Sequence, residues 1–222
     1  MTPEDDLKQT TGEMTLRTFV LALASPGPTP GGGAAGAVAL ALGRALVAMA
    51  SGISARKAPD ADRSRLEDAS RRETERAREN LGLGDADAEA FASFMAALAL
   101  PRASAAEAEA RRLAIGDAAR AAVDACRTAA QEAVDGLEAA SSVADRVRAT
   151  IVEDVRAGVA LLEASLSIAL ANLESNASYL PPEERDARIA EARSLLETGR
   201  ARAEEARAGA DAVEKGTGHG RT

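Results

Sequence analysis

Apolar residues recur along this chain at the three- and four-residue spacing of amphipathic helices, and no stretch shows the two-residue alternation of a strand. The pattern predicts a short helix over 16–24, which Thr15 can cap, and a long apolar helix over about 33–55. Further helices are expected over the ranges 62–80, 85–100, 104–134, 138–178 and 182–214. Gly136 is expected to end one helix, and the stretch 147–150 can stay helical within the next.

Helices of about thirty residues are roughly 45 Å long, at ~1.5 Å per residue. Because the links between them are short, we expect an all-α fold, an antiparallel bundle of long helices with a Pro/Gly-rich loop after a short first helix. The domain would span residues 15–214, between a disordered N-terminus over 1–14 and a disordered tail over 215–222.

Composition favours closely packed helices, because the apolar residues are mostly Ala, Leu and Val while aromatic residues make up only 2%. Phe91, Phe94 and Met95 are interpreted as core residues, and Cys126 as a small buried hydrophobic residue. The apolar stretch 31–53 is long enough to cross a membrane but contains Arg44, so it is interpreted as a buried helix.

Charge and rare residues narrow the possible partners and chemistry. A net charge of −8 argues against nucleic acid and against an anionic membrane surface as partners, and the acidic first residues predict a cytoplasmic protein. One cysteine and one histidine, His219 in the tail, exclude an internal disulfide, a Ser/His/Asp triad within the fold and a multi-histidine metal site. We therefore expect neither a metal nor a covalently bound cofactor.

The Pro/Gly-rich segment 25–33 is the first candidate site, with three prolines and four glycines in nine residues. Pro30, Gly31, Gly32 and Gly33 directly precede the long apolar helix, whose first N–H groups and positive dipole end can hold an anion. A flexible turn between two bundle helices is the alternative interpretation.

Two charged segments are further candidates. Arg56-Lys57 forms a basic turn, and Lys57 is one of only three lysines in a chain whose other basic residues are arginines. Asp85 and Asp87 stand at the start of an expected helix, where capping is the simpler explanation and catalysis the alternative.

The late helix carries polar residues on its apolar side. At 100° per residue, Asp154, Asn172 and Asn176 fall within about 40° of one another, beside several leucines. A polar group there costs stability unless it is paired, so each has a structural partner or a ligand. Asp154 and Asn172 are ~27 Å apart along the axis, too far to share one catalytic centre within a subunit.

Four blocks in order resemble the formiminotransferase-cyclodeaminase C-terminal family. They are the PTPGGG loop over 28–33, the lysine-containing turn at Arg56-Lys57, the DAEAF segment over 87–91 with Leu100-Pro101, and the late helix from Asp154 to Asn176. Together they lie within about residues 15–200. The family's serines are replaced here by Ala34 after the glycines and by Glu153 before the aspartate.

The resemblance implies a helical bundle, usually a homodimer, that acts on the one-carbon unit of a tetrahydrofolate bound near the glycine loop. It implies catalytic roles for Asp154, Lys57 and Asp87, and substrate contacts from these positions: Pro30, Gly31, Gly32, Gly33, Arg56, Asn172 and Asn176. Methenyltetrahydrofolate cyclohydrolase is the favoured activity. The alternatives are formiminotetrahydrofolate cyclodeaminase, and a homologue that binds folate or dimerises without catalysis, for which Ala34 and Glu153 are the evidence.

Overall fold

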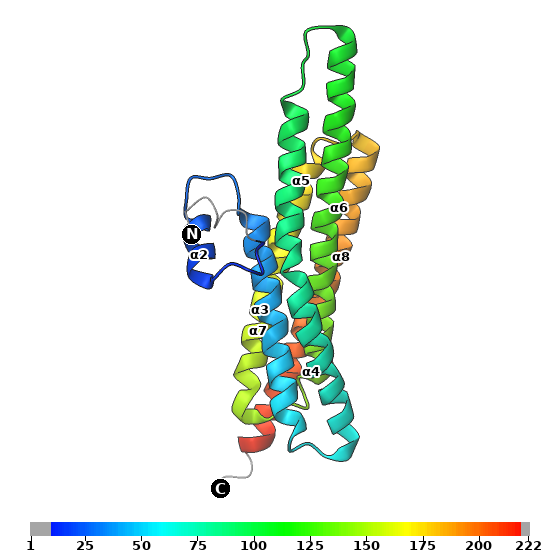
Figure 1. Ribbon diagram of the computed structural model, residues 1–222. Helices are drawn as coiled ribbons and strands as arrows, with labels where there is room; N and C mark the ends of the chain where they lie inside the picture. The colour runs from blue at the N-terminus through cyan, green and yellow to red at the C-terminus, as the bar shows by residue number, and fades with distance from the viewer. Residues whose placement is uncertain (1–9, 219–222) are drawn as a thin grey trace.

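The computed structural model describes residues 10–218, and this part of the chain is helical without strands. Its elements are α2 (Leu16–Leu23), α3 (Gly32–Ala55), α4 (Asp60–Asn80), α5 (Gly82–Leu98), α6 (Ala105–Val143), the 3-10 helix η1 (Ala149–Ile151), α7 (Val152–Ala177) and α8 (Pro182–Gly218). The predicted all-α antiparallel bundle is confirmed (Figure 1). His219 and residues 1–9 lie outside the described residues.

Helices α3, α6, α7 and α8 pack into a bundle, and α4 and α5 follow one another along α3 and α6 (Figure 1). The core is almost entirely Ala, Val and Leu, as the composition predicts, and Leu40, Val47, Leu137 and Leu162 are fully buried in it. Small residues let helix axes approach closely, and helices of this length bury a long continuous seam.

Helix ends follow the expected caps at Thr15 and Ser104 and differ from expectation at Gly136. Thr15 accepts a hydrogen bond from the Thr18 N–H (3.1 Å), and Ser104 forms a capping box with Glu107. Gly136 does not end a helix, because α6 continues to Val143. A Cβ at Gly136 would lie 2.7 Å from Leu162, so this glycine serves close helix packing instead of termination.

The stretch 147–150 is not helical throughout, contrary to expectation. Arg148 is extended, and its N–H donates to Ser54 Oγ at 3.0 Å, so α6 and α7 are separated by a turn and η1. This bond also places the start of α7 beside the end of α3. Residues 10–14 form a turn and residues 215–218 continue α8, although both segments were expected to be disordered.

Two helical segments of the described chain are long and apolar enough to cross a membrane by length and composition alone, 32–55 and 149–177. Core helices of soluble proteins pass the same test, and each segment packs within the bundle. Arg44, in the middle of α3, is only 2% exposed and binds Glu73 of α4 and Glu132 of α6. This buried ion-pair network ties three helices together, as expected for an interior helix.

Candidate active site

The glycine loop leads directly into the N-terminus of α3. Gly31 is the N-cap and provides no side chain, and the first bonded amide is that of Ala35, which donates to the Gly31 carbonyl at 3.1 Å. The N–H groups of the first turn therefore have no partner within the helix. Together with the helix dipole, they present a partial positive charge to whatever lies in front of them.

A cavity of about 230 Å³ opens at this helix end, between the loop, α5, α6 and α7. It brings together six residues that the sequence singled out: Gly31, Gly32, Gly33, Asp87, Asn172 and Asn176. Asn172 and Asn176 lie one turn apart on α7, so both amides can contact one ligand. The cavity unites residues separated by more than a hundred positions in the chain.

Asp87 lies against the glycine loop. A Cβ built at Gly33 would overlap the Asp87 carboxyl group, so only glycine allows the carboxyl group to lie this close to the first turn of α3. Burial raises the pKa of the Asp87 carboxyl group. Among the described residues, none forms a hydrogen bond or ion pair with this carboxyl group. Asp87 is thus available to exchange a proton with a ligand.

Asp85 and Asp87 do not cap a helix, contrary to the simpler interpretation, because α5 begins three residues earlier, at Gly82. Asp85 instead accepts hydrogen bonds from the N–H and hydroxyl groups of Thr11, at 2.8 and 2.9 Å. These bonds fasten the segment before α2 to α5. The two aspartates therefore differ in role, since Asp85 is structural and Asp87 faces the cavity.

Cys126 lies behind the cavity and is buried, as the sequence predicted. The Asn176 side-chain amide donates to its sulfur at 3.6 Å. Burial and the nearby Asp87 carboxylate raise the pKa of the Cys126 thiol to about 11. The thiol is therefore protonated at neutral pH and is no nucleophile.

Aromatic side chains gather at the cavity, a feature that the sequence analysis missed. Phe91 and Phe94 line it, and Phe94 packs edge-to-face on Tyr179, with ring centroids 4.7 Å apart. The interpretation of Phe91 and Met95 as core residues is wrong, because they are 40% and 48% exposed. Two of the chain's four aromatic residues thus line the cavity, and a third, Tyr179, packs against one of them. Phe91 and Phe94 share one face of α5, but this spacing does not distinguish a cavity wall from a buried face, and Tyr179 lies beyond the end of α7.

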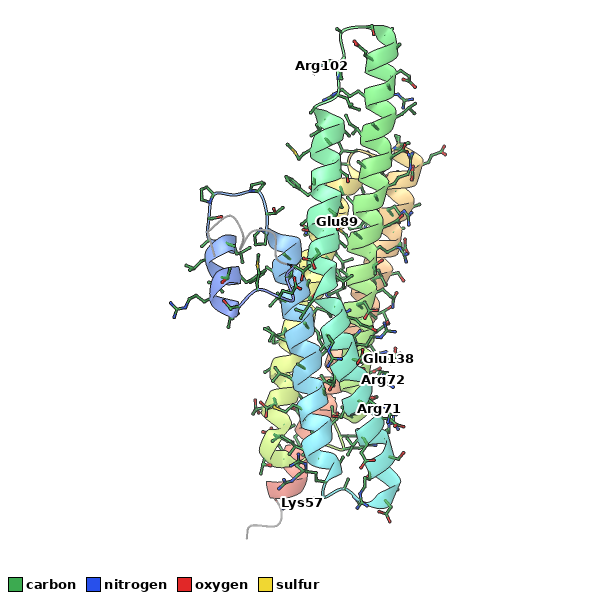
Figure 2. All side chains as sticks on the ribbon, viewed as in Figure 1. Lys57, Arg71, Arg72, Glu89, Arg102 and Glu138 are labelled. Carbon is green, nitrogen blue, oxygen red and sulfur yellow. The ribbon has the colours of Figure 1, made fainter. Side chains whose placement is uncertain are left out.

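The remaining predicted residues lie elsewhere. Pro30 lines an adjoining cavity beside α2. Arg56 and Lys57 follow the far end of α3, ~36 Å from Gly33 along the axis. Figure 2 shows Lys57 at the lower end of the bundle, and Glu89, two residues after Asp87, far above it near mid-height. Asp154 is in the first turn of α7, also at that far end. A single subunit therefore does not assemble all the predicted residues.

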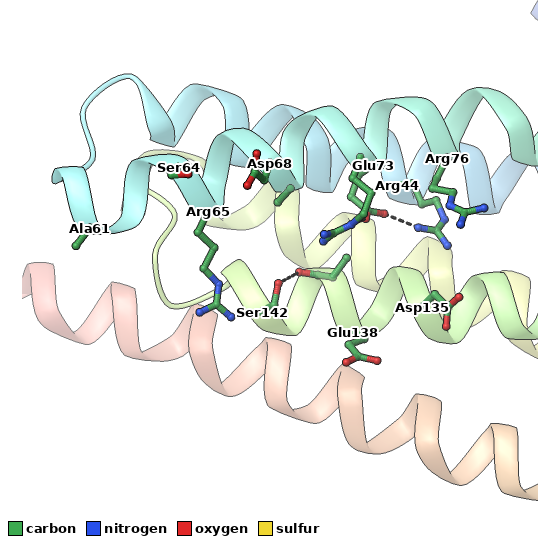
Figure 3. Close-up of a pocket in the computed structure, with 13 residues that line it drawn as sticks. Arg44, Ala61, Ser64, Arg65, Asp68, Glu73, Arg76, Asp135, Glu138 and Ser142 are labelled. Carbon is green, nitrogen blue, oxygen red and sulfur yellow. Dashed lines mark hydrogen bonds and ion pairs between the residues drawn. The ribbon is translucent and has the colours of Figure 1, made fainter.

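A second, larger groove of about 770 Å³ runs between α4 and α6 (Figure 3). Four arginines and four carboxylates line it, so its charge is balanced: Arg44, Arg65, Arg72, Arg76, Asp68, Glu73, Asp135 and Glu138. The Arg44–Glu73 pair forms its floor. This groove has no aromatic residue and no glycine loop in its lining, and its buried charges are already paired.

The sequence model of the formiminotransferase-cyclodeaminase family matches residues 15–194, which is more than half of the chain. The chain belongs to the formiminotransferase-cyclodeaminase family. The resemblance inferred from the four sequence blocks is thereby confirmed. The matched residues include every residue that lines the cavity.

The fold agrees with a solved structure. The crystal structure of formiminotetrahydrofolate cyclodeaminase from Thermotoga maritima superposes with a TM-score of 0.79, covering 90% of this chain and 98% of that one at 20% identity. At this identity the likeness establishes the helical-bundle fold. No curated protein sequence matches the chain.

Proposed function

We propose that this protein acts on a tetrahydrofolate that carries a one-carbon unit on N5 and N10, and that it hydrolyses 5,10-methenyltetrahydrofolate to formyltetrahydrofolate. The observation that carries the proposal is the cavity in which the Asp87 carboxyl group, two asparagines and two phenylalanines meet the open N-terminus of α3. It offers one proton-exchanging group, amides for hydrogen bonds and ring faces for a flat heterocycle.

These groups are sufficient for hydrolysis of a methenyl group, which needs a proton acceptor and hydrogen-bond donors. Water adds to the cationic methenyl carbon and loses a proton to Asp87, and then one carbon–nitrogen bond breaks as its nitrogen takes up a proton. Burial raises the pKa of Asp87, which brings it closer to neutral pH and suits it to both transfers. The free N–H groups of Gly32 and Gly33 can stabilise negative charge on the added oxygen.

The pteridine ring would occupy the cavity. Phe91 and Phe94 provide ring faces, while the Asn172 and Asn176 amides both donate and accept hydrogen bonds, as the polar edge of a pteridine requires. A volume of about 230 Å³ is below the ~300–1,000 Å³ of most small-molecule pockets. It therefore suits the ring end of a folate, with the glutamate tail outside it.

Cyclodeamination of formiminotetrahydrofolate is the second candidate, supported by the family and by the described activity of the Thermotoga maritima protein. The same carboxyl group would donate a proton to the departing ammonia, which a raised pKa also favours. We further propose that the protein is a cytoplasmic homodimer, as the family resemblance implies.

The two reactions are distinguished by parallel assays. Hydrolysis is followed as loss of the near-ultraviolet absorbance of methenyltetrahydrofolate against a buffer blank, and deamination as ammonia released from the formimino substrate. Loss of methenyl absorbance that Asp87→Asn abolishes supports the hydrolase. Ammonia release alone would replace it with the deaminase, and inertness toward both would leave a homologue that binds without catalysis.

A further inference from the structure

A second, much smaller space adjoins the cavity, deeper in the bundle, where α3, α5, α6 and α7 converge. Its volume is about 20 Å³, and it is called the chamber here. Gly33, Asp87 and Asn172 line both the cavity and the chamber. The rest of the chamber lining comes from positions further into the bundle, such as Ala37 on α3 and Ser165 on α7. Asp87 therefore borders two spaces of very different size.

The chamber has the size and the polarity of a site for one water molecule. Four of its lining side chains are polar: the Asp87 carboxyl group, the Asn172 amide, the Ser165 hydroxyl group and the Cys126 thiol. Ser165 is only 1% exposed and Cys126 only 6%. A water molecule needs roughly 10–15 Å³ and about two to four polar partners, whereas cavities that stay dry are apolar. The chamber meets both conditions.

The Asp87 carboxyl group needs a hydrogen-bond donor that the protein does not provide. Within residues 10–218, no N–H or O–H group donates to it, and its desolvation by burial is not offset by a neighbouring charge. An ionised carboxylate left without a donor is costly. A ring that fills the cavity displaces water from that side of Asp87, but the chamber is too small to admit the ring. Water in the chamber therefore remains beside Asp87 when a ligand binds.

We propose that the chamber holds one ordered water molecule that donates a hydrogen bond to the Asp87 carboxylate, and that Ser165 is the positioning residue that holds this water. Ser165 lies two turns before Asn172 on the same face of α7, and the Asn172 side chain leans back toward it, as helical side chains do. A buried helical serine bonds the carbonyl group one turn earlier and keeps its lone pairs as acceptors.

The hydrogen bonds of such a water molecule are balanced. Its two protons go to Asp87 and to the Ser165 oxygen, and its lone pairs accept from the Asn172 amide and the Cys126 thiol. The Cys126 sulfur already accepts a hydrogen bond from Asn176 at 3.6 Å, and its thiol is protonated at neutral pH, so the S–H group remains available as a donor. All four polar groups of the chamber then have a partner.

The groups packed against Asp87 leave its charge to be stabilised by this water. They are uncharged and come from three helices: Gly33 and Ala37 from α3, Ser165 and Asn172 from α7, and the protonated Cys126 thiol from α6. On α5 itself, Asp85 is bonded to Thr11 and Glu89 is exposed. A hydrogen bond to the ionised form lowers a pKa, so the water limits the rise that burial causes at Asp87. If the proposed function holds, on which this last step rests, the water keeps Asp87 a proton acceptor while the folate ring is bound.

A crystal structure of the protein without folate tests the chamber first. We expect one water molecule within about 3.2 Å of an Asp87 carboxyl oxygen and of Ser165 Oγ. A map that shows other buried water molecules and no density in the chamber overturns the proposal.

The pKa of Asp87, measured by carbon-13 NMR of its carboxyl carbon and assigned with Asp87→Asn, tests the effect of the water without any substrate. Ser165→Ala removes one partner of the water, and Ala129→Val fills the chamber with methyl groups. Each should raise the pKa of Asp87 by about one pH unit or more, as expected for loss of a hydrogen bond to a charged group. The matched control, Ile168→Val, trims the chamber wall and keeps every polar group, so it should leave this pKa unchanged.

Two results of the NMR titration contradict the proposal. An unchanged pKa in both Ser165→Ala and Ala129→Val overturns the water itself. A rise in Ala129→Val alone overturns the role of Ser165.

The pH dependence of kcat/KM then tests the link to catalysis, in whichever of the two assays the protein is active. In Ser165→Ala, the pH below which kcat/KM falls should move up by the same unit as the pKa of Asp87, while the rate at high pH is retained. A pKa that moves without a change in this profile overturns the role of the water in catalysis. A wild type inert toward both substrates defeats the proposed function instead, and the crystal structure and the NMR titration still decide the chamber.

Discussion

Replacing Gly33 by alanine should separate catalysis from stability. The new methyl group would overlap the Asp87 carboxyl group, which must withdraw by about 1.5 Å to restore an ordinary contact of ~3.5–4 Å. Since the carboxyl group ends a flexible side chain, this shift is cheap. Alanine also favours a helix over glycine by about 0.5–1 kcal/mol, and Gly33 has no positive φ. We expect the melting temperature to change by no more than about 2–4 °C.

Activity should respond far more strongly. A catalytic group displaced by about 1 Å costs roughly a hundredfold in rate, so kcat/KM should fall about 100-fold, or ~2.7 kcal/mol. The matched control is Gly116→Ala, where the Cβ makes only an ordinary 3.6 Å contact with Arg120; it should keep full activity. Thermal unfolding and steady-state kinetics check both expectations. A Gly33→Ala variant with wild-type kcat/KM would refute the claim that catalysis depends on the position of the Asp87 carboxyl group.

Three further perturbations test the surroundings of the site. Asp87→Asn should raise the melting temperature at pH 7, because burial penalises the ionised carboxylate of the wild type. The gain should shrink as the pH falls toward 3.8, because the raised pKa lets Asp87 take up its proton in the folded protein at a higher pH than in the unfolded chain. A gain in melting temperature that does not depend on pH would contradict this cause. Arg44→Leu should lower the free energy of unfolding, measured in urea, by about 3–5 kcal/mol, because it leaves the Glu73 and Glu132 carboxylates without this partner. A loss of unfolding free energy below about 1 kcal/mol would show that water replaces the arginine. Cys126 should react slowly with maleimide in the folded protein at pH 7.5, and rapid labelling would be inconsistent with a buried thiol whose pKa is about 11.

The fold follows closely from the sequence because the signals are local. Thr15 and Ser104 cap the helices that they were expected to cap, and proline or glycine interrupts the chain between helices. The errors arose where tertiary contacts override local preference. Gly136 is a packing glycine against Leu162, and Arg148 leaves the helix because its N–H reaches Ser54. Neither partner is visible from the local sequence.

The site was predictable in parts. The glycine loop, Asp87 and the two asparagines were named from sequence, and they meet in one cavity. Helical spacing could not place the aromatic residues, since a partly exposed Phe91 at the cavity and a buried one have the same position on α5. Lys57 and Asp154 were assigned to the same chemistry through family resemblance alone, and the length of α3 and α7 separates them from the cavity within one chain.

The central claim is that the cavity between the glycine loop, α5 and α7 binds a reduced folate. A crystal structure with a stable tetrahydrofolate derivative tests it most directly. We expect the pteridine ring beside Phe91, with Asn172 or Asn176 on its polar edge and the Asp87 carboxyl group near the one-carbon position. A folate bound in the groove between α4 and α6, with this cavity empty, would contradict the account.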